Sequence, residues 1–196
     1  MIDSFLKFLE FGLYHIVSFS SYDHILFLVV LTAPYAFKDW TRLLLLVSFF
    51  TLGHTLSLLL GVYDIINLKV NVVEWLIPFT IIIMALYNIF TSGKASKKSN
   101  PIIIVCLVLF FGLIHGLGFA NSFEAVVGSD ESTLLSIIEF ALGIELGQFV
   151  IVFSVLFFGF LGQTIFRLSS RDWVMVLSAV VIGLMLPLIV DSPLFY

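Results

Sequence analysis

The sequence contains several long, uninterrupted apolar runs, and they limit the possible folds more than any other feature. Only α-helices and closed β-barrels satisfy their backbone hydrogen bonds inside lipid, and barrel strands need alternating apolar and polar residues. The runs here do not alternate. About 20 residues, at a rise of 1.5 Å each, cross a hydrocarbon core of roughly 30 Å as a helix. The sequence therefore predicts an all-α integral membrane protein.

Composition agrees with a protein that resides in lipid. Of the 196 residues, 61% are hydrophobic and 11% are charged, and the mean hydropathy is +1.18. A soluble domain carries about 25% charged residues, so a soluble globular domain is excluded. The 9 Lys and Arg residues are too few and too scattered for binding nucleic acid. A single cysteine, Cys106, excludes an internal disulfide and a cluster of thiolate ligands.

The apolar segments predict six transmembrane helices in one compact bundle, a single domain of residues 1–196. An amphipathic, partly inserted helix at 3–20 precedes them and would make a seventh span if it inserts fully. The expected spans are about 22–37, 41–62, 70–92, 101–120, 133–160 and 172–190. The helical stretch that begins at 133 runs on to about 166, so it must tilt, break or project into water.

The basic residues between these spans predict the orientation of the chain. With the N-terminus outside, the inner loops hold Lys38, Arg42, Lys94, Lys97, Lys98, Arg167 and Arg171, and the outer segments hold Lys7 and Lys69. Loops on the cytoplasmic side are enriched in Lys and Arg. We therefore expect a protein of the bacterial inner (cytoplasmic) membrane with both termini outside.

His115 lies deep in the apolar run 101–120, between glycines, and an ionisable residue inside a membrane segment is by default a hypothesis about function. The other embedded ionisable groups fall in the same outer half of the predicted bundle. These groups are Asp23, His24, His54, Glu74, Glu139 and Glu145, and His15 flanks them on the amphipathic segment. The predicted topology thus places imidazoles and carboxylates from several helices at similar depth.

Imidazole and carboxylate ligands without a thiolate suit borderline divalent cations such as nickel, cobalt and zinc. We predict a metal site formed by His15, Asp23, His24, His54, Glu74, His115 and Glu145, with Ser57, Asn121, Glu139 and Gln148 as supporting groups that orient the ligands. Cu(I) would require Cys or Met near the site. Met84 is expected toward the inner leaflet, and Met175 and Met185 share no motif with the histidines.

Glycine and proline support the convergence of these helices. Gly112 and Gly116, like Gly143 and Gly147, have the spacing of small residues that lets helices approach closely. Pro78 cannot donate a hydrogen bond to the carbonyl group of Glu74, which leaves that oxygen free for an ion or a water.

Several segments resemble the HupE/UreJ family, in its broader second branch, over nearly the whole chain. They are 23–28, 50–55, 73–74, 111–120 and 143–148, and the most specific is Phe-Gly-Leu-Ile-His-Gly-Leu-Gly-Phe-Ala at 111–120. The resemblance implies a small nickel or cobalt permease, with hydrogenase and urease accessory roles in the family. It also implies functional roles for His15, Asp23, His24, His54, Glu74, His115, Glu145 and Gln148.

We therefore predict a divalent-metal transporter, whose partners are the metal ion and the lipid bilayer and not nucleic acid. Two alternatives remain open. Three histidines and a carboxylate could hold zinc with an open position for water, as in an intramembrane hydrolase. The protein could also be a metal sensor or an assembly subunit without transport.

Overall fold

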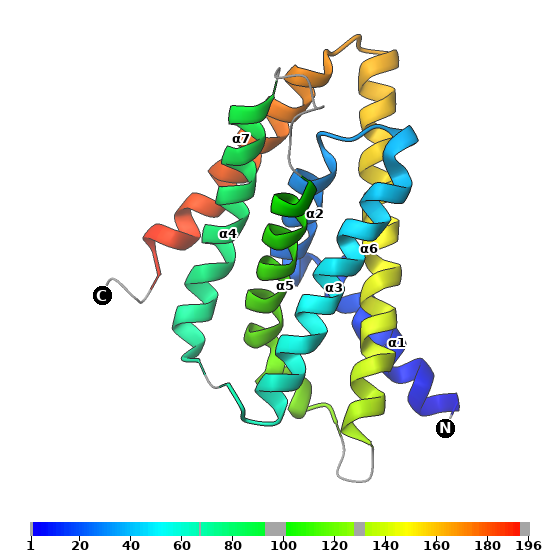
Figure 1. Ribbon diagram of the computed structural model, residues 1–196, viewed down its shortest axis with the longest axis vertical. Coiled ribbons are helices and arrows are strands. Elements are labelled where there is room, and N and C mark those ends of the chain that lie inside the picture. The colour runs from blue at the N-terminus through cyan, green and yellow to red at the C-terminus, as the bar shows by residue number, and fades with distance from the viewer. Residues whose placement is uncertain (1, 67, 93–100, 128–131, 193–196) are drawn as a thin grey trace.

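The computed structural model describes residues 2–66, 68–92, 101–127 and 132–192, and all regular secondary structure in these residues is helical (Figure 1). The elements are α1 (Ile2–Val17), η1 (Phe19–Ser21), α2 (Tyr22–Thr32), η2 (Phe37–Asp39), α3 (Trp40–Val62), α4 (Val70–Thr91), α5 (Pro101–Glu124), α6 (Thr133–Thr164) and α7 (Ser170–Val190). The helices form one compact bundle, which confirms the predicted fold class.

Five helical segments among the described residues are long and apolar enough to cross a membrane: η2 with α3, α4, the central part of α5, α6 and α7. A sixth crossing requires α1 and α2 together, because α2 has only 11 residues and is about 16 Å long. These two helices meet at a bend of 68°. The segment expected to lie at the membrane surface and the first expected span thus pass as a membrane segment only together, in the form of a broken span or a re-entrant loop.

The other helices match the apolar runs with few changes. The run from 133 forms one unbroken helix of 32 residues, α6, which exceeds one membrane thickness at about 48 Å. Helix α5 continues past the expected end of its span, to Glu124. Helix α3 packs on α5 and α6, α1 packs across α6, and α4 packs on α7 (Figure 1).

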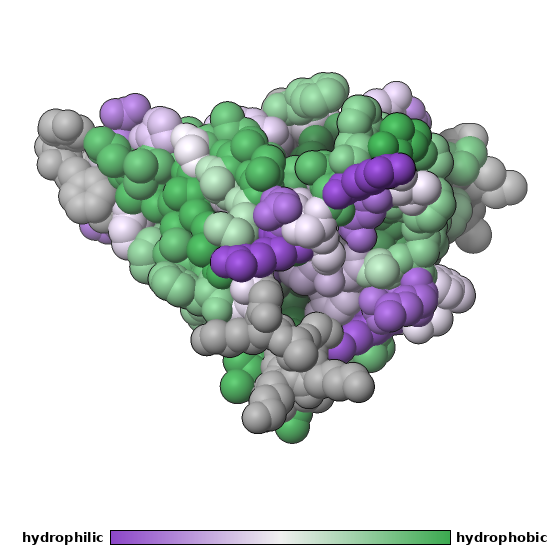
Figure 2. Space-filling view, turned by 90° about the horizontal axis from the view of Figure 1, so that it is seen from above, coloured by the Kyte–Doolittle hydropathy of each residue, from purple (hydrophilic) through white to green (hydrophobic). Residues whose placement is uncertain are grey.

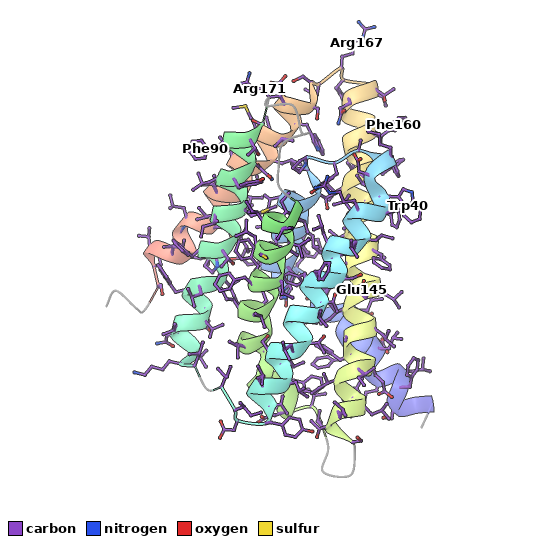
Figure 3. All side chains as sticks on the ribbon, in the orientation of Figure 1. Trp40, Phe90, Glu145, Phe160, Arg167 and Arg171 are labelled. Carbon is purple, nitrogen blue, oxygen red and sulfur yellow. The ribbon has the colours of Figure 1, made fainter. Side chains whose placement is uncertain are left out.

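Charged side chains lie at both ends of the bundle. Arg167 and Arg171 lie together at the end where α6 turns into α7 (Figure 3). Seen from that end, hydrophilic side chains stand among the apolar ones (Figure 2). At the opposite end, Lys7 lies 3.4 Å from the carbonyl oxygen of Val126, just after α5. The loop 93–100, with its three lysines, is outside the described residues.

Glycines allow two helix pairs to make close backbone contact. A Cβ atom on Gly112 of α5 would overlap the carbonyl oxygen of Phe50 on α3, and one on Gly116 would overlap the carbonyl oxygen of His54. The pair α1 and α6 meets in the same way, because a Cβ atom on Gly143 would overlap the carbonyl oxygen of Leu9. Small residues at such crossings allow dense packing in lipid. Contact at Gly116 holds the histidine segments of α3 and α5 against each other.

Replacing these glycines tests the close packing. Alanine normally favours a helix over glycine by about 1 kcal/mol, but here the added Cβ atom meets backbone, and overpacking costs about 1–3 kcal/mol. We expect Gly112→Ala and Gly143→Ala to lower the unfolding temperature of the detergent-solubilised protein. Gly183→Ala is the matched control, because a Cβ atom there meets nothing within 4 Å. Equal unfolding temperatures for all three variants would contradict the packing described here.

Candidate metal centre

Three histidines from three helices meet inside the bundle. His15 lies in the last turn of α1, His24 in the first turn of α2 and His54 within α3. One ring nitrogen from each lies within 4.8 Å of the others. Around a tetrahedral ion with bonds of 2.0–2.1 Å, ligand nitrogens lie ~3.3 Å apart. Small side-chain shifts would therefore let the three rings bind one ion.

The break between α1 and α2 brings two histidines of this cluster, His15 and His24, together. In a continuous helix, two residues nine positions apart are separated by about 13.5 Å along the axis. The turn η1 and the 68° bend bring the rings of His15 and His24 to a centroid separation of 4.7 Å instead. The ring of His54 lies 5.8 Å and 5.9 Å from these two rings.

His115 adds a fourth imidazole from α5. Its ring centroid lies 5.1 Å from that of His24. Its Nδ1 atom lies 2.7 Å from the carbonyl oxygen of Phe111, and a carbonyl oxygen only accepts, so Nδ1 carries the hydrogen and donates it. The lone pair of the neutral ring is then on Nε2, which is the atom available to a metal ion.

Asp23 orients the ring of His24. Its Oδ1 atom lies 3.1 Å from Nδ1 of His24, and it also accepts a hydrogen bond of 2.9 Å from the backbone N–H of His24. A carboxylate that binds Nδ1–H in this way directs Nε2 toward a metal ion and increases its basicity. Asp23 is one-quarter exposed, whereas His24 is buried.

Several buried ring nitrogens of this cluster have no hydrogen-bond partner among the described residues. They are Nε2 of His15, His24 and His115, and both ring nitrogens of His54. Buried polar atoms in proteins are nearly always paired, and each exception requires an explanation. One ring nitrogen from each of His15, His24 and His54 lies within 4.8 Å of the others, and unpaired ring nitrogens are the atoms that a metal ion would use. The donor set therefore fits a bound transition-metal ion.

A cavity of about 250 Å³ lies beside the cluster. It is lined by residues of α1, α2, α4, α5 and α7, with the η1 turn: His15, Ser21, Tyr22, Asp23, His24, Glu74, Ile77, Pro78, Gly118, Phe119, Met185 and Leu188. Water occupies about 30 Å³ per molecule, so the cavity has room for an ion with several waters. Glu74 is exposed and lines this cavity one helical turn before Pro78.

Two other predicted residues lie in the contact between α3 and α6. The carboxylate of Glu145, labelled in Figure 3, accepts a hydrogen bond of 2.5 Å from the hydroxyl group of Ser48. One turn later, Gln148 accepts a hydrogen bond of 2.9 Å from Thr51. Neither Glu145 nor Gln148 lines the cavity beside the histidines. Their assignment to the metal site stays a prediction.

The remaining supporting residues have separate positions. Ser57 is buried, and its hydroxyl group donates to the carbonyl oxygen of His54 at 3.1 Å. Glu139 is also buried on α6, and its Oε2 atom has no partner among the described residues. The side chain of Asn121 lies outside the described residues. Ser57 thus contacts the backbone of a cluster residue directly.

The sequence did not indicate two parts of the site. Phenylalanines surround the imidazoles: Phe119 lies 4.0 Å from His15, and Phe50 lies 5.2 Å from His115, between ring centroids. Met185 of α7 lines the cavity, although it shares no motif with the histidines. No local sequence pattern indicates either part, because both depend on which helices pack against each other.

A family model described as HupE / UreJ protein matches residues 1–190. The chain belongs to the HupE/UreJ family. This is the family that the motifs around His24, His54 and His115 resemble. No curated protein and no solved structure matches the chain. Membership of the HupE/UreJ family, together with the apolar helices, supports a membrane protein that handles metal ions.

Replacing single histidines tests the centre. We expect His54→Ala and His115→Ala to abolish stoichiometric metal binding without loss of expression, because each removes an imidazole that has an unpaired nitrogen and lies near another imidazole. The measurement is elemental analysis of protein purified after incubation with nickel, cobalt or zinc. Ser178→Ala is the control, since this buried hydroxyl group also lacks a partner within the described part of the chain but does not line the cavity. Wild-type metal content in both histidine variants would refute the assignment.

Proposed function

We propose that this HupE/UreJ protein transports a divalent transition-metal ion, of the nickel, cobalt or zinc type, across a membrane. The observation that carries this proposal is the meeting of four imidazoles with unpaired buried nitrogens, three of them on buried side chains and the fourth on the half-buried His15. Neutral imidazoles bind borderline ions well and hard ions poorly. Membership of the family supports metal handling independently of this geometry.

The residues have different roles in this proposal. His15, His24 and His54 bind the ion through ring nitrogens, and His115 offers Nε2 from the adjacent helix. Asp23 orients His24 and supplies negative charge that compensates for the ion. Glu74 lies exposed at the cavity and attracts the hydrated cation.

Depth along the helices favours entry from the outer side. His54 and His115 lie eight and nine residues from the ends of their helices on the side of the α3–α4 connection, or about 12–14 Å. Glu74 is four residues into α4 from that same side. The positive-inside rule makes this side the outside of a bacterial inner membrane, so the site is in the outer half of the bilayer.

Cysteine labelling tests this orientation. In a Cys106→Ser background, we expect Lys69→Cys to react with a membrane-impermeant thiol reagent added to right-side-out vesicles. Arg167→Cys should react only after the vesicles are permeabilised, because it lies at the opposite end of the bundle (Figure 3). The reverse pattern would show that the site opens toward the cytoplasm.

Transport itself is tested in proteoliposomes that contain a metal-sensitive dye. We expect the wild-type protein to admit nickel or cobalt, and Glu74→Gln to slow uptake at low metal concentration severalfold, because the cavity loses a negative charge. Glu10→Gln, which removes an exposed carboxylate of α1 outside the cavity, should not change the rate. A protein that binds metal stoichiometrically but admits none would contradict transport and favour an enzyme or a sensor.

A further inference from the structure

Met185 lies on α7, in the wall of the cavity that also contains His15, Asp23, His24 and Glu74. It is fully buried. Helix α7 packs mainly on α4 and also contacts α2, which carries Asp23 and His24. Its contribution to the cavity consists of Met185 and Leu188, which lie on one face of the helix at a spacing of three residues. Met185 therefore supplies the only atom from α7, among the described residues, that offers a soft lone pair to this cavity.

We propose that Met185 is a specificity-determining residue whose thioether sulfur binds the ion held by the histidines. The inference rests on the proposed metal transport and adds a soft ligand to it. Thioethers bind soft ions and contribute little to the binding of hard ions such as Mn²⁺ or Mg²⁺. The exposed carboxylate of Glu74 attracts any cation, so discrimination between cations requires a further ligand that prefers soft ions.

The surroundings of Met185 agree with this role. Ring nitrogens of His15 and His24, which line the same cavity, have no partner among the described residues. Methionine has three rotatable bonds and a polarizable sulfur atom, so its side chain can follow an ion that shifts between these ligands. The single cysteine, Cys106, is exposed on α5, nine residues before His115. Met185 is thus the residue that places a sulfur atom in the wall of the cavity that His15 and His24 also line.

Met84 offers a matched comparison. It is buried on α4, like Met185 on α7, and both residues belong to the hydrophobic core, but Met84 does not line the cavity. Leucine has nearly the volume of methionine and is usually tolerated in its place. Met185→Leu and Met84→Leu therefore each remove one buried sulfur atom, and only the first removes it from the cavity.

The test uses X-ray absorption spectroscopy of the full-length protein in a Cys106→Ser background, loaded with Cu⁺ as the softest probe. We expect a sulfur scatterer beside the imidazole nitrogens in the Cys106→Ser protein and in Met84→Leu, and none in Met185→Leu. Labelling the Cys106→Ser protein with selenomethionine should replace this scatterer by selenium, which tests the ligand without altering residue 185. In competition assays, the preference for Ni²⁺ over Mn²⁺ should fall about tenfold in Met185→Leu, a loss of the size typical for a group that tunes a metal site.

Two results would overturn the inference. Imidazole coordination without sulfur or selenium would leave the histidine site intact and remove Met185 from it. A sulfur signal that persists in Met185→Leu would assign the ligand to another residue. If the Cys106→Ser protein and the wild type bind neither metal, the proposed function itself fails, and the inference fails with it.

Discussion

The break between α1 and α2 is the feature on which the rest of the site depends. A helix that stops within a membrane leaves backbone groups without partners, and lipid offers none. Here the 3-10 turn closes part of the gap: the N–H of Ser18 bonds to the carbonyl oxygen of Tyr14, and that of Ser21 bonds to Ser18. Both helices also pack against α6. The bundle thereby tolerates a bend that brings His15 and His24 together.

Close packing of α3 and α5 positions the other two histidines of the site, His54 and His115. The glycines of α5 let it contact the backbone of α3 at His54, so His115 and His54 lie on adjoining surfaces. Phenylalanines such as Phe27, Phe50 and Phe140 are fully buried around these rings and separate them from lipid. Phenylalanine side chains have no donor atom for a metal ion. Their contribution is a dense apolar wall that leaves the imidazoles facing one another.

How much of the site could be predicted from the sequence differs among residues. His24, His54 and His115 are recognisable in the sequence as candidate site residues. An ionisable group within an apolar membrane segment has a high free-energy cost and is therefore rare. Depth along each helix follows from simple counting, and so Glu74 was expected near the outer surface. The direction in which a side chain points around its helix axis does not follow from counting residues. Glu145 has similar depth, but it bonds to Ser48 in the contact between α3 and α6.

The sequence by itself determined the helical bundle, the family, and which imidazoles and carboxylates fall within the apolar helices. These properties depend on local composition and on the rule that lipid imposes on the backbone. Only the tertiary structure decided that α1 and α2 meet at a sharp bend, that Asp23 bonds to His24, and that Met185 lines the cavity. Those relations depend on which helix surfaces meet. Apolar residues cover nearly every helix of this protein on all sides, so the sequence pattern does not identify the face that each helix buries.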